Sequence, residues 1–252
     1  AGRDLMSASV LQQLLDVRTR RGAGYLTLLD PDRLSLEQLE SRSVACADAG
    51  ADAILVGTSL MLSASANTEL FQRLRSAVDI PVISFPGDVG QVVSSADAIL
   101  FLSMVSGRNA ELLIGQHVRA APLLKEYGVE VIPTAYMLVE SGTLTSVEYM
   151  SNTKPIPRSK NDIAMAHALA AQFLGMGLVY LETGSGAAAS VPDSMIESVS
   201  VYVDIPVIVG GGIRDPETAR KKVDAGAAFV VTGTAVESDP GRLRELSAAV
   251  HT

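Results

Sequence analysis

The chain has 252 residues, of which 48% are hydrophobic and 19% are charged, so its composition excludes an intrinsically disordered protein and favours a packed globular one. The formal net charge of −8 argues against nucleic acid as the main partner, because phosphate backbones attract basic surfaces. A single cysteine, Cys46, excludes an intramolecular disulfide and a cysteine-based zinc cluster, and its place in a predicted helix among alanines favours a packing role.

Eight short apolar runs predict eight β-strands. In chain order they are residues 25–30, 53–57, 82–85, 98–103, 130–134, 178–182, 207–210 and 229–232. Most of them are continuously apolar, which is typical of strands buried on both faces of a parallel sheet.

Helical patterns separate most of these strands. Residues 36–49 follow Ser35, a predicted N-cap that Gln38 completes as a capping box, and residues 216–225 follow the predicted N-cap Asp215. Eight β/α units in about 250 residues predict an α/β fold of the (β/α)8 TIM-barrel type, with a doubly wound open sheet as the alternative. No Gly/Ser/Pro-rich linker divides the chain, so we expect a single domain over residues 1–252.

Two connections are irregular. Residues 86–97 are too few, and too rich in glycine, for a full crossover helix, so we expect the third barrel helix to be missing or reduced. Residues 140–160 are long, polar and proline-containing, and such loops on barrels are usually functional, although a purely structural excursion is the alternative. The longest apolar stretch, residues 164–181, is interrupted by His167 and Gln172 and makes a poor membrane span. The start of the chain shows no pattern typical of a signal peptide, and we expect a soluble cytoplasmic protein.

Three glycine-rich segments follow the last three predicted strands, at residues 180–186, 209–214 and 231–235. Glycine at a strand end lets backbone N–H groups approach a ligand closely, and the loops after strands seven and eight form the usual phosphate site of this fold. Tight turns between strand and helix are the alternative for each segment alone. Together the three segments predict a phosphate site.

Oxygen-bearing side chains follow the first two strands. Asp30 ends the first strand, Asp32 comes two residues later, and Ser59 follows the second strand. Mg²⁺ prefers hard oxygen ligands and often takes one carboxylate together with substrate phosphates, so Asp30 with Ser59 suits a magnesium diphosphate. For Asp32, a carboxylate at a helix N-terminus is the simpler interpretation.

Glu182 and Tyr180 lie on one face of the sixth strand, because side chains alternate with period two. A carboxylate beside a phosphate site needs another task, and Glu182 can bind a hydroxyl group or accept its proton. We expect structural or surface roles for His117 and His167. No dinucleotide fingerprint follows the first strand, so such a cofactor is not expected.

Several motifs in this order resemble the geranylgeranylglyceryl phosphate synthase family, which includes the bacterial heptaprenylglyceryl phosphate synthases. They are Leu29-Asp30-Pro31-Asp32, Val56-Gly57-Thr58-Ser59, residues 106–109 and 114–118, Tyr180-Leu181-Glu182-Thr183-Gly184-Ser185-Gly186, and residues 209–213. The likeness extends from about residue 25 to residue 237. The segment 180–186 is its most specific part, whereas the glycine run at 210–212 is common to many phosphate-binding barrels.

The resemblance implies a TIM barrel whose third helix is replaced, and transfer of a long prenyl chain from its diphosphate to the C3 hydroxyl of sn-glycerol 1-phosphate. It implies Mg²⁺ as cofactor, with ligands at Asp30 and Ser59. In a mechanism consistent with this activity, Glu182 binds the acceptor's hydroxyl and can take its proton, while Tyr180 orients that hydroxyl. Residues 152–159 resemble the family's flexible active-site region. The implied substrate contacts are Tyr180, Leu181, Glu182, Thr183, Gly184, Ser185, Gly186, Gly211, Gly212, Gly233 and Thr234.

One departure concerns Leu28, because some members carry a lysine there. Leu28 and the long 140–160 segment resemble a second branch of this family, whose members are mostly oligomeric. We therefore expect a homo-oligomer (dimer or hexamer) with at most peripheral membrane contact. Three alternatives stay open: prenyl transfer to a phosphoglycerate, isomerase or lyase chemistry on a sugar phosphate, and a non-catalytic binding protein. The five lysines, none at a predicted strand end, disfavour the second, and Asp30, Ser59 and Glu182 disfavour the third.

Overall fold

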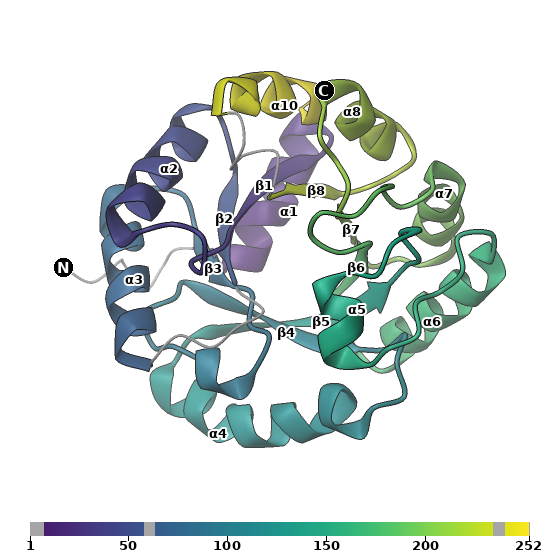
Figure 1. Ribbon diagram of the computed structural model, residues 1–252, viewed down its shortest axis with the longest axis horizontal. Helices are drawn as coiled ribbons and strands as arrows, with labels where there is room; N and C mark the ends of the chain where they lie inside the picture. Colours follow the sequence, from purple (N-terminus) through teal and green to yellow (C-terminus); the bar gives the residue numbers. More distant parts are fainter. Residues whose placement is uncertain (1–7, 58–63, 234–239, 252) are drawn as a thin grey trace.

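Eight parallel strands close into a barrel in the computed structural model, which describes residues 8–57, 64–233 and 240–251 (Figure 1). Each strand pairs with its neighbours in the sequence, and β1 pairs with β8 to complete the ring. The strands are β1 (Gly24–Leu29), β2 (Ala53–Val56), β3 (Val82–Ser84), β4 (Ala98–Met104), β5 (Glu130–Leu138), β6 (Leu178–Glu182), β7 (Val207–Gly210) and β8 (Phe229–Thr232). The predicted barrel is confirmed, and the open-sheet alternative is wrong.

The helices are α1 (Val10–Arg21), α2 (Leu36–Asp48), α3 (Ala64–Ala77), α4 (Gln116–Tyr127), the short α5 (Ser146–Ser151), α6 (Asn161–Phe173), α7 (Asp193–Tyr202), α8 (Pro216–Asp224) and α10 (Leu243–Val250). Most of them surround the barrel in a ring, whereas α1 and α5 lie inside this ring in the view of Figure 1. The Ser35–Gln38 capping box forms, and Asp215 accepts a hydrogen bond from the backbone N–H of Thr218, so both predicted N-caps are confirmed.

The connection between β3 and β4 holds only a three-residue 3₁₀ turn, η1 (Val89–Gln91). The prediction that the third barrel helix is reduced is therefore confirmed. A second irregular element, the π-helical turn η2 (Glu111–Gly115), leads into α4, and the 3₁₀ turn η3 (Pro240–Arg242) leads into α10.

The barrel interior is filled by alternate side chains of the strands. One cluster of buried residues contains Leu26, Leu55, Ile83, Leu100, Ile132, Leu178, Ile208 and Phe229. Val10 and Leu14 of α1 belong to the same cluster, so this helix closes the N-terminal end of the barrel. Glu130, at the start of β5, fixes α1 by accepting hydrogen bonds from the backbone N–H groups of Val10 and Leu11.

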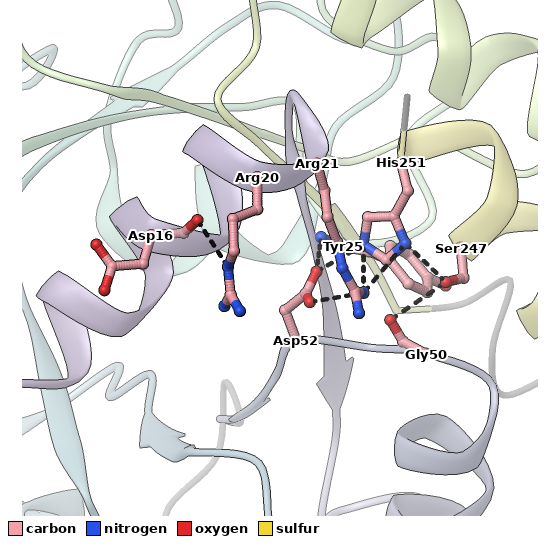
Figure 2. Close-up of polar contacts among 8 residues, drawn as sticks. All are labelled: Asp16, Arg20, Arg21, Tyr25, Gly50, Asp52, Ser247 and His251. Atoms are coloured by element: carbon pink, nitrogen blue, oxygen red, sulfur yellow. Dashed lines mark hydrogen bonds and ion pairs between the residues drawn. The ribbon is translucent and has the colours of Figure 1, made fainter. Parts of the chain in front are cut away.

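A polar cluster at the same end holds the C-terminal helix (Figure 2). The buried carboxylate of Asp52 accepts a hydrogen bond of 2.8 Å from the backbone N–H of Tyr25. His251 Nε2 lies 2.8 Å from the same oxygen, Asp52 Oδ2, and Arg21 Nη1 lies 3.3 Å from Oδ1. The Ser247 hydroxyl donates a hydrogen bond to the backbone carbonyl of Gly50, in the connection between α2 and β2. These contacts tie the two ends of the chain together, on the side of the barrel away from its strand C-termini.

The largest difference from the predicted strands is in β5, which runs to Leu138 and not to Thr134. The extension pairs with β4 on one side, where Met104 faces Tyr136, and with β6 on the other, where Leu138 faces Glu182. After it, Ile156 forms a parallel bridge to Val139, which anchors the long 140–160 connection. None of the described helices is long and apolar enough to cross a membrane.

Candidate active site

Two cavities meet at the C-terminal end of the barrel. A small one of about 50 Å³ and a large one of about 640 Å³ share the residues Leu28, Glu182, Ser185 and Gly233. Glu182 therefore lies where the two cavities join.

The small cavity is lined by the predicted glycine-rich segments, which come together from β6, β7 and β8. Ser185, Gly186, Gly211, Gly212 and Gly233 all face it. Gly211 has a φ of +81°, and a Cβ atom there would lie 2.3 Å from Glu182 Oε1 and 2.4 Å from Thr183 Oγ1. No larger residue fits at this position without displacing the carboxylate.

Other residues of these segments lie elsewhere. Alternation along β6 turns the Leu181 side chain outward into the layer between barrel and helices, so only its backbone can contribute to the site. Thr183 is buried but faces neither cavity, and Thr234 lies outside the described residues. Arg214 was missing from our predicted site, yet it lines the small cavity and donates a hydrogen bond of 2.7 Å to the Ala187 carbonyl. The signal was present in the sequence, because Arg214 directly follows the Gly-Gly-Gly-Ile segment.

Glu182 is almost fully buried, with 6% of its surface exposed. Its Oε1 accepts a hydrogen bond of 2.6 Å from the backbone N–H of Gly184. Burial raises the pKa of Glu182 from 4.5 to about 7, and the Gly184 N–H and the nearby Tyr180 hydroxyl partly oppose this rise. A carboxyl group with a pKa near neutrality can accept and release a proton under ordinary conditions.

Tyr180 lies beside Glu182, as the period-two pattern predicts. A Cβ atom on Gly210 would lie 2.6 Å from both the Tyr180 hydroxyl and Glu182 Oε2, so the two groups approach the same point. Within the described part of the chain, the buried hydroxyl of Tyr180 has no hydrogen-bond partner of ordinary geometry. Burial, with a further contribution from the Glu182 charge, raises the pKa of Tyr180 and keeps the phenol protonated. The protonated phenol is a hydrogen-bond donor beside the Glu182 carboxyl group.

Two aromatic rings that we did not predict pack against Tyr180. The ring centroids of Tyr136 and Phe85 lie 5.4 Å and 5.5 Å from that of Tyr180, and 6.1 Å from each other. Phe85 and Tyr136 line the large cavity. Together the three rings form an aromatic floor beneath Glu182.

Asp30 also lines the large cavity, at the end of β1. Its Oδ1 accepts a hydrogen bond of 3.0 Å from the backbone N–H of Asp32, and its Oδ2 lies 3.3 Å from Arg33 Nε. Since a carboxylate has about four acceptor positions, it retains capacity for a metal. Asp32 lines neither cavity, and Ser59 lies outside the described residues. Among the residues described, no group of three or more His, Cys, Asp or Glu side chains could hold a metal ion. Mg²⁺ often takes only one or two protein carboxylates and completes its shell with substrate phosphates and water, which is the kind of site that a single carboxylate such as Asp30 suits.

The large cavity extends from Glu182 along the side of the barrel where the third helix is reduced. Its walls come from η1, from the outward and inward faces of β4, and from α4, with Val92, Leu100, Phe101, Leu112 and Ala120 among them. A full helix after β3 would occupy this space. The cavity thus depends on the shortened connection.

His117 of α4 is buried in the wall of this cavity, and its ring meets Phe101 edge-on at 4.5 Å. Burial lowers the pKa of His117. The sequence indicated a structural or surface role, and did not indicate that His117 faces a cavity. His167 lies at the surface, where its Nδ1 contacts the Ile163 carbonyl.

The sequence matches the PcrB family over residues 15–250. The chain belongs to this family. Proteins named geranylgeranylglyceryl phosphate synthase are similar over nearly their whole length: one from Spirosoma linguale is 46% identical over 94% of this chain and 95% of its own, and one from Chitinophaga pinensis is 42% identical over 98% and 97%.

A crystal structure of (S)-3-O-geranylgeranylglyceryl phosphate synthase from Thermoplasma acidophilum, in complex with its substrate sn-glycerol-1-phosphate, superposes with a TM-score of 0.92. It is 34% identical, and the match covers 97% of this chain and 99% of that one. The resemblance inferred from the motifs is thereby confirmed, and this PcrB-family chain is an enzyme of the prenyltransferase class.

Proposed function

We propose that the chain transfers a long prenyl group, with geranylgeranyl diphosphate as the donor, to the C3 hydroxyl of sn-glycerol 1-phosphate, and that the reaction depends on magnesium. The supporting observation is that a small glycine-lined cavity and a large apolar cavity meet at the buried carboxyl group of Glu182. One cavity suits a small phosphorylated acceptor and the other suits a long hydrocarbon, so the reacting atoms meet at the junction.

The acceptor belongs in the small cavity. Backbone groups of Gly186, Gly211 and Gly212 surround it, and Arg214 adds a positive charge. Such a cradle suits the phosphate of a three-carbon compound. The related T. acidophilum enzyme was crystallised with sn-glycerol-1-phosphate, which supports the choice of acceptor.

The donor's chain belongs in the large cavity. Its walls are mostly aliphatic and aromatic, and each CH₂ group removed from water contributes about 0.8 kcal/mol. The cavity can therefore supply much of the affinity for the donor, while its polar end near Asp30 suits the diphosphate.

The transfer breaks the bond between the allylic C1 and the diphosphate oxygen, and the electron pair leaves with the diphosphate. The acceptor's hydroxyl oxygen forms the new bond to C1, and its proton passes to Glu182. Tyr180 donates a hydrogen bond at the same point and orients the hydroxyl, while the fixed phosphate directs it toward C1. A Mg²⁺ ion held by Asp30 would neutralise the diphosphate and make it a better leaving group. Replacing Asp30 by Asn tests this ligand. The neutral amide has the same size as the carboxylate but would bind Mg²⁺ more weakly, so most activity should be lost while the fold is kept.

The deciding experiment supplies purified enzyme and Mg²⁺ with labelled sn-glycerol 1-phosphate and prenyl diphosphates from C10 to C35. We expect an ether product and release of diphosphate, with C20 preferred. A phosphoglycerate and the opposite enantiomer of glycerol phosphate are tested as control acceptors under the same conditions. Faster turnover with either would overturn the assignment of the acceptor, and no product with any pair would overturn the function.

A further inference from the structure

A lysine is buried close to the segment that follows the small cavity. Lys222, in the last turn of α8, is only 4% exposed. Burying an ammonium group costs free energy unless the group is paired and hydrogen-bonded, so a buried lysine indicates a specific contact. Its neighbour Lys221 is the ordinary case, because its side chain is 57% exposed and pairs with Glu217 on the surface of the same helix.

The ammonium group of Lys222 contacts the start of the neighbouring helix. Its Nζ donates a hydrogen bond of 2.7 Å to the backbone carbonyl of Val191 and a second hydrogen bond to Asp193 Oδ1. Val191 is fully buried, whereas Asp193, the first residue of α7, is about half exposed. Because α7 and α8 are neighbours in the ring of helices (Figure 1), the lysine fixes the chain before α7 to α8.

The segment held by Lys222 continues from the loop that lines the small cavity. Ser185 and Gly186 face this cavity, and residues 187–191 follow them directly. Arg214, which also lines the cavity, donates a hydrogen bond of 2.7 Å to the carbonyl of Ala187, at the other end of the segment. Two cationic side chains thus hold segment 187–191, one at each end.

The middle of the segment packs against a glycine of the cavity. Gly212 lines the small cavity, and a Cβ atom there would lie 2.7 Å from the backbone nitrogen of Ser190 and 2.8 Å from the carbonyl carbon of Ala189. Backbones in such close contact do not move independently, because a small shift of one displaces the other. The hydrogen bond from Lys222 to the end of the segment therefore influences the position of Gly212 in the cavity wall.

We propose that Lys222 is a positioning residue for the acceptor, which holds segment 187–191 so that the small cavity has its phosphate-binding shape before the acceptor arrives. The proposal rests on the proposed function, in which this cavity takes the phosphate of sn-glycerol 1-phosphate. A preformed cavity avoids the loss of entropy that ordering a loop on binding would cause. Lys222 lines neither of the two cavities, so it acts on the acceptor only through the segment.

Lys222→Met tests this role. Methionine is apolar and close to lysine in length, and the half-exposed Asp193 is not left as a buried charge, so we expect the variant to fold. The dissociation constants of sn-glycerol 1-phosphate and of inorganic phosphate, measured by calorimetry without donor, should rise about ten-fold. KM for the acceptor should rise in parallel, whereas kcat should fall less than about three-fold, because the bound phosphate orders the segment at saturation. Binding of the prenyl diphosphate should be unchanged.

Two controls separate positioning from charge and from stability. Lys221→Met removes the same charge from the preceding residue but leaves segment 187–191 attached, so it should bind both probes within about two-fold of the wild type. Asp52→Ala, in the polar cluster at the opposite end of the barrel, should bind both probes normally although it is less stable. Circular dichroism and thermal melts establish that each variant folds.

Asp193→Ala provides a second variant in case Lys222→Met does not fold. The substitution is at a half-exposed position and removes one of the two contacts of the Lys222 ammonium group. Loss of a negative charge alone would strengthen the binding of an anion, and Glu217→Ala, on the surface of α8, measures that effect. We expect Asp193→Ala to bind inorganic phosphate about three-fold more weakly than Glu217→Ala does.

Wild-type affinity for both probes in Lys222→Met would overturn the proposal, and so would equal weakening in Lys221→Met. If Lys222→Met does not fold, binding by Asp193→Ala that is as tight as binding by Glu217→Ala would overturn it. These outcomes leave the proposed acceptor unaffected, because the wild type still binds it. A wild type that binds neither probe would instead overturn the proposed acceptor site, and the role of Lys222 with it.

Discussion

The carboxyl group of Glu182 accepts a 2.6 Å hydrogen bond from the backbone N–H of Gly184, two residues further along the chain. This bond joins the proposed base to the loop that lines the cavities, so the position of one fixes the other. It also favours the ionised carboxylate, while burial disfavours it, and the balance leaves the pKa at about 7.

Glu182→Gln tests the role of this group in the transfer. The glutamine side chain can still accept the hydrogen bond from Gly184, but it cannot take a proton from the acceptor. We expect kcat to fall by roughly 10²–10⁴-fold, the range usual for loss of a general base. Binding of the prenyl diphosphate, measured by calorimetry, should change little. A variant that keeps its kcat but loses thermal stability would give Glu182 a structural role only.

The pH dependence of stability provides a second test of the same residue. Because the pKa of Glu182 is raised in the folded state, folding is favoured by the protonated form, and this contribution declines as the pH rises from about 4.5 to about 7. At 1.36 kcal/mol per pH unit the decline is about 3 kcal/mol. The free energy of unfolding of Glu182→Gln, relative to the wild type, should therefore be higher by about that amount at pH ~8 than at pH ~5. Urea titrations at the two pH values measure it, and an unchanged difference would contradict the raised pKa.

Activity should show the opposite trend. Only the ionised carboxylate can accept the proton, so kcat/KM of the wild type should rise with pH and level off above about pH 7. Residual activity of Glu182→Gln should lack this rise. A rise of the same shape in the variant would assign the titration to another group.

The Asp52 cluster should affect stability without affecting catalysis. Asp52→Ala leaves the backbone N–H of Tyr25 without its acceptor and separates His251 from its partner (Figure 2). We expect the free energy of unfolding to fall by about 2–4 kcal/mol and the melting temperature to fall by several degrees. His251→Ala should cost less, because Asp52 keeps the contacts with Tyr25 and Arg21. A large loss of kcat in folded Asp52→Ala would contradict the separation of this cluster from the site.

Local patterns in the sequence were sufficient for the barrel and for the junction at Glu182. Continuous apolar runs located all eight strands, and period-two alternation placed Tyr180 beside Glu182. Tyr136 was missed because the fifth strand was predicted to end at Thr134, whereas it runs to Leu138. In the structure the strand continues, since partners on both sides supply hydrogen bonds that a single-sequence pattern does not contain.

The large cavity could not be predicted residue by residue. A short connection after β3 indicated that a helix was reduced, but not which side chains would face the vacated space. His117 and Ala120 lie on a helix with ordinary periodicity, and they face the cavity only because no neighbouring helix covers them. Such positions follow from tertiary packing, whereas the glycine-rich loops are visible in the sequence because backbone geometry demands glycine there.

Ala120→Phe tests whether the large cavity holds the prenyl chain. Ala120 is a buried residue of α4 that lines this cavity, so the added ring would fill part of its space. Loss of space for two methylene groups should shift preference from C20 toward C10 or C15 donors by about ten-fold in kcat/KM. Ala121→Phe, at the exposed neighbouring position of the same helix, is the control. Equal chain-length preference in both variants would place the prenyl group elsewhere.

Gly211→Ala tests the small cavity, and Gly175→Ala is its matched control. Both glycines have a φ of +81°, so alanine at either position costs about 1–2 kcal/mol of backbone strain. At Gly175 the new Cβ meets nothing within 4 Å, whereas at Gly211 it meets Glu182 Oε1 and Thr183 Oγ1. Melting temperatures should fall for both variants, and further for Gly211→Ala. Only Gly211→Ala should lose kcat/KM for the glycerol phosphate, by about 10²-fold, because displacing the carboxylate by an ångström misaligns the acceptor. If folded Gly211→Ala showed normal kinetics, the acceptor would not bind in the small cavity as proposed.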